Sequence, residues 1–113
     1  MKLLAPFLML TLGATLGAAG LAVADEPLSD SQALSLLSKY GCQACHQVNG
    51  GQNAPSYHAI AREYSSDSSA IDFLQSSVQN GSSGVFGDSA MPGGDVPSAD
   101  LRAMINWILQ LQL

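Results

Sequence analysis

The sequence predicts a small all-α domain, and three observations lead to this prediction. Apolar residues recur three and four positions apart in four stretches of the chain, which is the pattern of a helix with one buried face. No stretch shows the alternation of apolar and polar residues that is typical of a strand. Two of the helical stretches end at a glycine or an Asn-Gly pair, which suit a left-handed helix end. We therefore expect about four helices and no strands.

The segment 1–24 is expected to be a cleavable signal peptide. A positively charged start precedes an apolar or small run from Leu3 to Leu21, and Ala22-Val23-Ala24 offers a cleavage site. The alternative is an uncleaved membrane anchor, because the run is close to the ~20 residues that a membrane span requires. Its glycines and small-residue end favour cleavage. We expect export to the periplasm, with membrane attachment only if the segment is retained.

Residues 25–113 would then form one small domain. The whole chain has a formal net charge of −5, and removal of Lys2 makes the domain more negative. Its remaining basic residues are few and scattered. This charge argues against nucleic acid or an anionic membrane surface as a partner. The basic residues are Lys39, Arg62 and Arg102.

The first helix is expected to follow Ser29 and to end at Gly41. Ser29 and Gln32 have the spacing of a capping box, and Leu28 can pack as a hydrophobic staple. Gly41 suits the helix end. The helix therefore leads directly into the cysteines that follow. Its apolar stripe consists of Ala33, Leu34, Leu36, Leu37 and Tyr40.

Three further helices are expected, separated by polar or glycine-rich segments. The segment 48–56 is rich in Asn, Gly, Gln and Pro and predicts a loop. The segment 82–97 is long, rich in Gly and Pro, and without a period, which is typical of a functional loop. The last helix is expected at about 98–110. The three apolar faces are Tyr57, Ile60, Ala61 and Tyr64; Ile71, Leu74 and Val78, ending at Asn80-Gly81; and Leu101, Met104, Ile105 and Ile108.

The motif with the clearest chemistry is Cys42-Gln43-Ala44-Cys45-His46, a C-x-x-C-H pattern typical of covalent haem attachment. Each thiol can add across one porphyrin vinyl group, and the adjacent imidazole of His46 can ligate the iron. A disulfide between Cys42 and Cys45 would cross-link very little of the chain. A bound haem would instead contribute a large apolar face to a modest core.

Two other uses of the motif are possible. A zinc site could combine its three side chains with His58, but no second histidine follows at the required spacing, and adjacent Cys45 and His46 fit a tetrahedral site poorly. A thioredoxin-like dithiol would need a βαβ setting that the sequence lacks. The export signal and the lack of any other cysteine favour haem.

The second axial ligand of such a haem is expected to be Met91. It lies in Ala90-Met91-Pro92-Gly93-Gly94, where proline stiffens the backbone and the glycines allow close approach. A thioether suits ferrous iron and raises the reduction potential relative to a second imidazole. Met104 is expected to fill the core of the last helix, and His58 to be an exposed residue of the second helix.

With these motifs in order, the chain from about Leu28 to Leu109 resembles the small bacterial class I cytochromes c, of the short type found with respiratory denitrifying electron chains. The His46-to-Met91 interval also fits that type. The family-like segments are 39–46, 54–57, 80–87, Met91-Pro92 and 101–109 with Trp107.

The resemblance implies further roles. The Pro55 carbonyl would accept a hydrogen bond from Nδ1 of His46, and the first and last helices would cross near Gly41 and Trp107. Phe86 would lie at the haem periphery, where a tryptophan is common. Two further departures concern Ser77, where a propionate-binding arginine is common, and Gly94, where an asparagine often bonds to the ligand sulfur.

The function implied is that of a soluble periplasmic monohaem c-type cytochrome, which shuttles single electrons between respiratory redox proteins and is not an enzyme. One haem c would be bound through Cys42 and Cys45 and ligated by His46 and Met91. With both axial positions filled, no small-molecule substrate is expected, and the partners would be transient redox donors and acceptors of a monomer. The alternative is a haem-based ligand sensor or peroxidase-like enzyme with a displaceable Met91.

Overall fold

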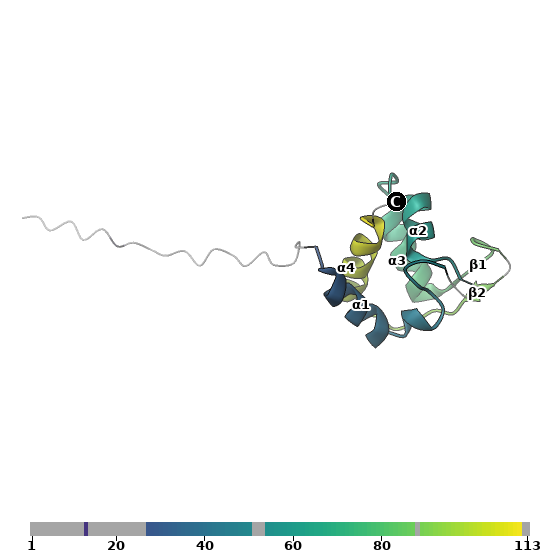
Figure 1. The fold of residues 1–113 in the computed structure, drawn as a ribbon, viewed down its shortest axis with the longest axis horizontal. Helices are drawn as coiled ribbons and strands as arrows, with labels where there is room; N and C mark the ends of the chain where they lie inside the picture. The colour runs from purple at the N-terminus through teal and green to yellow at the C-terminus, as the bar shows by residue number, and fades with distance from the viewer. Residues whose placement is uncertain (1–12, 14–26, 51–53, 88, 112–113) are drawn as a thin grey trace, which may run out of the picture.

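Four helices dominate the part of the chain that the computed structural model describes, namely residues 13, 27–50, 54–87 and 89–111. Apart from Gly13, the predicted signal peptide lies outside these residues. The elements are α1 (Asp30–Lys39), the 3₁₀ turn η2 (Cys42–Ala44), α2 (Tyr57–Tyr64), α3 (Ala70–Asn80), β1 (Ser82–Ser83), β2 (Ala90–Met91) and α4 (Ser98–Leu109). Figure 1 shows their arrangement, with α1 beside α4 and the β1–β2 hairpin at the edge away from α4.

The all-α prediction is confirmed, with one local difference. β1 and β2 form a small antiparallel sheet that pairs Ser82 with Met91 and Ser83 with Ala90. Each strand has only two residues, which is too short for an alternating pattern to be visible in the sequence. In the described ranges, no helix has the length and apolar character needed to cross a membrane.

The predicted caps of α1 are present. The Gln32 amide donates to Oγ of Ser29 over 3.2 Å, and the Ser29 amide donates to Oε1 of Gln32 over 2.9 Å. At the other end, Gly41 has the left-handed dihedrals φ 75° and ψ 10°. This turn ends the helix and directs the chain at once into η2 and its Cys42.

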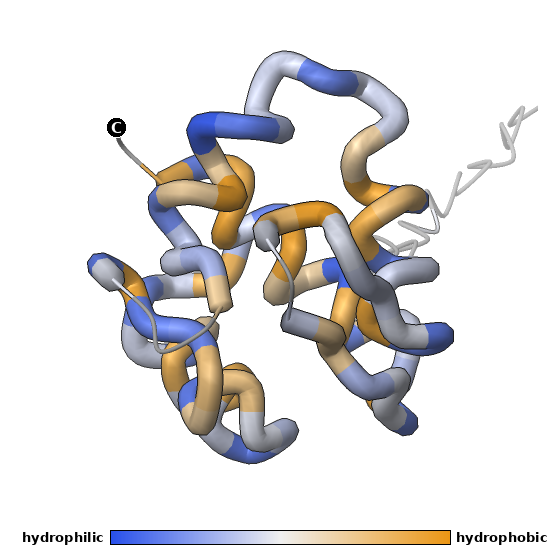
Figure 2. Tube along the Cα trace, turned by 90° about the vertical axis from the view of Figure 1, so that its right-hand side faces the viewer, coloured by the Kyte–Doolittle hydropathy of each residue, from blue (hydrophilic) through white to orange (hydrophobic). Residues whose placement is uncertain are grey.

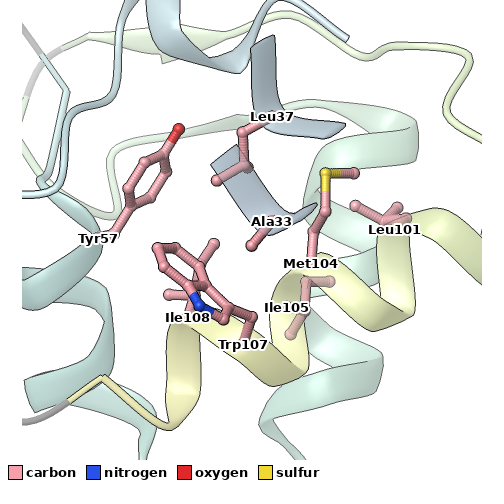
Figure 3. Close-up of a cluster of buried hydrophobic side chains, with 8 residues drawn as sticks. All are labelled: Ala33, Leu37, Tyr57, Leu101, Met104, Ile105, Trp107 and Ile108. Carbon is pink, nitrogen blue, oxygen red and sulfur yellow. The ribbon is translucent and has the colours of Figure 1, made fainter. Parts of the chain in front are cut away.

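The core lies mainly between α1 and α4 (Figure 3). Met104 is 1% exposed and so fills the core, as predicted. The hydrophilic residues gather at the outer turns (Figure 2). The buried cluster consists of Ala33, Leu37, Tyr57, Leu101, Met104, Ile105, Trp107 and Ile108.

Two polar contacts join opposite ends of α1 and α4. Nε1 of Trp107 donates to Oδ1 of Asp30 over 3.0 Å, and the Tyr40 hydroxyl donates to Oδ2 of Asp100. The bond to Asp100 also raises the pKa of Tyr40. The resemblance predicted that the two helices cross near Gly41 and Trp107. Trp107 instead pairs with the start of α1, because the two helices run in opposite directions.

Candidate cofactor site

The Cys42–Cys45 segment forms one wall of a cavity. Both thiols are free, and the 3₁₀ turn is closed by the His46 amide, which donates to the Cys42 carbonyl over 2.9 Å. Cys42 is half-buried, and this burial raises the pKa of its thiol. Cys45 is exposed. Since both residues line the same cavity, a single occupant can reach both sulfurs.

The imidazole of His46 is fixed on two sides. Nδ1 lies 2.7 Å from the Pro55 carbonyl, and because a carbonyl only accepts, Nδ1 carries the proton. This is the hydrogen bond that the resemblance predicted, and it leaves Nε2 with a free lone pair. The ring also stacks on Tyr57, with centroids 5.8 Å apart and planes at 21°.

The loop before α2 holds these partners in place. The Tyr57 amide donates to the Gln47 carbonyl over 2.8 Å, and the His58 amide donates to Val48. Ser56 caps the helix by accepting from the Ala59 amide over 3.0 Å. The start of α2 is therefore tied to the residues that directly follow His46.

Met91 lies in β2 and lines the same cavity as the cysteines and His46. The chain segment that carries Met91 is joined to α3 by the Gly94 amide, which donates to the Val78 carbonyl over 2.9 Å. Met104 also lines the cavity, but from the buried core of α4. The prediction that His58 is exposed is wrong, because its side chain is half-buried. His58 does not belong to the cavity wall.

The cavity has a volume of about 700 Å³ and a mainly apolar wall, which suits an organic cofactor. The state of the Tyr57 hydroxyl also indicates that the cavity holds a cofactor. Tyr57 is 1% exposed and lines the cavity, and its hydroxyl is the one buried side-chain N or O atom without a hydrogen-bond partner among the described residues. Burial raises the pKa of Tyr57, so the hydroxyl is a neutral donor. Two thiols, one oriented imidazole and an apolar wall fit a covalently attached haem.

Part of the rim is an aromatic cluster of Tyr64, Phe73 and Phe86. The Tyr64 ring lies 5.7 Å from Phe73 and 6.3 Å from Phe86. Phe86 is 39% exposed and lines the cavity, as does Ser77, whose hydroxyl donates to the Phe73 carbonyl over 2.9 Å. Sequence reasoning missed this cluster because its members come from α2, α3 and the following loop, which no fixed spacing connects.

Charged side chains are missing from this wall. Among the described residues that line the cavity there is no Lys, Arg, Asp or Glu.

The zinc alternative lacks support from the structure, since no three His, Cys, Asp or Glu side chains gather into a metal-binding group in the described ranges.

Comparison with known proteins gives a consistent result. The chain matches the family Cytochrome c over residues 33–112. It is 32% identical over 99 residues to cytochrome c-552 of Hydrogenobacter thermophilus, covering 88% of this chain and 93% of the relative. It is 39% identical over 90 residues to cytochrome c-551 of Allochromatium vinosum, covering 79% of this chain and 93% of the relative. The crystal structure of wild-type Nitrosomonas europaea cytochrome c552 superposes with a TM-score of 0.67 at 38% identity, covering 70% of this chain and 99% of that one.

Proposed function

Because the chain belongs to the cytochrome c family, as a small class I monohaem electron-transfer protein and not an enzyme, we propose the following site. One haem c is attached through Cys42 and Cys45 and ligated by His46 and Met91. The observation that carries this proposal is that all four side chains line one apolar cavity. A bound haem would supply an iron that stores and releases one electron.

The residues of the chain have separate tasks. Cys42 and Cys45 would hold the haem through two thioether bonds, in each of which the thiol sulfur would be joined to one vinyl carbon and the thiol hydrogen to the other. Pro55 keeps the His46 proton on Nδ1 and so leaves Nε2 available to a metal. Met91 supplies a soft, neutral sulfur from the opposite chain segment.

The chain is a carrier of electrons, and the sensor or peroxidase-like alternative is not favoured. A peroxidase-like reaction needs an acid–base pair near the open iron position. The described cavity wall holds only His46, two cysteines and three tyrosines as titratable groups. With His46 and Met91 both holding the iron, the mainly apolar wall would instead keep water and small molecules away from it.

We also propose a cellular location and partners for the protein. Segment 1–24 is removed on export, and the domain 25–113 works as a monomer in the periplasm. It exchanges electrons with transient donors and acceptors of respiratory chains, which include the denitrifying type suggested by the sequence resemblance. The acidic composition supports protein partners rather than nucleic acid or anionic lipid.

Carbon monoxide binding to the purified holoprotein tests the carrier function. We expect a reversible one-electron titration and no carbon monoxide complex of the ferrous protein at neutral pH, because Met91 occupies the position. Ready formation of that complex by the wild-type protein would favour the sensor or enzyme alternative.

A further inference from the structure

The segment that carries Met91 is joined to the end of α3 by backbone contacts rather than by buried side chains. Every described residue of 83–90 is exposed, and Met91 itself is half-buried. The fixed points are the pairing of Ser82 with Met91 and the hydrogen bond from the Gly94 amide to Val78. The last turn of α3 and the residues after it therefore set the position of the Met91 backbone.

Gly81 lies at the closest approach of the two segments. A Cβ atom on Gly81 would be 2.9 Å from the Met91 carbonyl oxygen and 3.0 Å from the Gly93 nitrogen. From the other side, a Cβ atom on Gly93 would be 2.8 Å from the Gln79 carbonyl oxygen. Neighbours at these distances are backbone atoms that cannot rotate away, so a side chain at either glycine must separate the segments.

We infer that Gly81 is a positioning residue for the Met91 ligand, because its lack of a side chain lets the Met91 backbone lie directly on the end of α3. This inference rests on the proposed ligation by Met91. Gly81, which directly follows α3, acts through the Met91 backbone, which holds the thioether at the iron and so limits the access of competing bases.

The holoprotein variants Gly81→Ala and Gly84→Ala test the inference as a matched pair. Gly81 and Gly84 both have a positive φ, of +85° and +73°, so alanine strains the backbone at both, and the ψ of 165° adds to that strain at Gly81. A Cβ on Gly84 meets no atom within 4 Å. The readouts are the sulfur-to-ferric-iron charge-transfer band and the affinity of the ferric protein for imidazole. We expect Gly81→Ala to weaken the band and to bind imidazole roughly tenfold or more tightly than Gly84→Ala, because the free-energy cost of overpacking a close contact converts to a factor of about ten or more if it weakens the bond from Met91 to the iron.

A second pair decides the question even if Gly81→Ala fails to fold. Gly93→Ala introduces the contact with Gln79 without a positive φ, whereas a Cβ on Gly94 meets no atom within 4 Å. We expect tighter imidazole binding only in Gly93→Ala. Equal imidazole affinity within both pairs would overturn the inference. A wild-type protein without the charge-transfer band would overturn Met91 ligation itself, and with it the inference, which distinguishes the two failures.

Discussion

The His46 side of the cavity rests on helix packing and long-range side-chain contacts, whereas the Met91 side rests on the backbone at the end of α3. His46 bonds to Pro55 and stacks on Tyr57, which belongs to the buried cluster of α1 and α4. Met91 is half-buried in a two-residue strand. The difference indicates that one proposed ligand is fixed by the core of the fold and the other by a short contact that can be loosened separately.

The largest effect is expected from the cysteines on the His46 side. In Cys42→Ser/Cys45→Ser, no thioether can form, so we expect complete loss of covalently bound haem. Denaturing electrophoresis followed by a haem stain measures this directly. Retention of haem on the denatured variant chain would contradict attachment through these two sulfurs.

Truncation of the two cavity-lining methionines should lower the free energy of unfolding by different amounts. Met104 is 1% exposed in the α4 core, and Met104→Ala should lower the free energy of unfolding by about 2–5 kcal/mol, as buried methionine truncations do. Met91→Ala should lower the polypeptide's own stability less, because it removes little buried surface. Chemical denaturation of the ferric holoproteins saturated with imidazole, which takes the place of Met91 at the iron in wild type and both variants, isolates the packing effect. Equal losses would contradict this view of the two sides.

The contact between Asp30 and Trp107 tests the helix pairing behind His46. Asp30→Ala leaves the buried Trp107 indole N–H without its acceptor, which should cost about 1 kcal/mol of unfolding free energy. Asp72→Ala is the control, since it removes only an exposed ion pair with Arg102 and should cost roughly 0.5 kcal/mol or less. Urea denaturation compares them. A control that loses as much as Asp30→Ala would argue that general charge effects, not the indole bond, stabilise this side.

The smallest effect concerns charge on the Met91 side. Ser77→Arg adds a cation to a wall that holds none among its described residues, and a cation favours the reduced haem. An interaction on the order of 1 kcal/mol corresponds to a rise of roughly 40 mV in a one-electron potential. Ser76→Arg is the control of equal charge, because Ser76 does not line the cavity. Equal shifts in a redox titration of both variants would show that only net charge matters.

The parts of the fold that local sequence determines could be predicted. The Ser29–Gln32 capping box and the left-handed Gly41 depend on neighbouring residues, and both are present. The end of α3 was predicted less well: Gly81 has a positive φ, but its ψ of 165° is extended rather than left-handed helical. The C-x-x-C-H motif and Met91 were proposed as site residues on similarly local grounds, by residue type and neighbours, and the structure places them in the wall of one cavity.

The contacts that were not predicted join residues far apart in the chain. Asp30 and Trp107 are 77 positions apart, and the Tyr64–Phe73–Phe86 cluster combines three separate segments. The role of Gly81 depends on a contact with Met91 that exists only after α3 and the loop have folded together. Periodicity and motif spacing carry no information about such contacts.

The central claim is that Met91, and not the other cavity-lining methionine, closes the haem opposite His46. The sulfur-to-ferric-iron charge-transfer band of the holoprotein tests it most directly. We predict that the band is present in the wild-type protein and in Met104→Ala, and absent from Met91→Ala. A band that persists in Met91→Ala, or that disappears in a folded Met104→Ala, would contradict the claim.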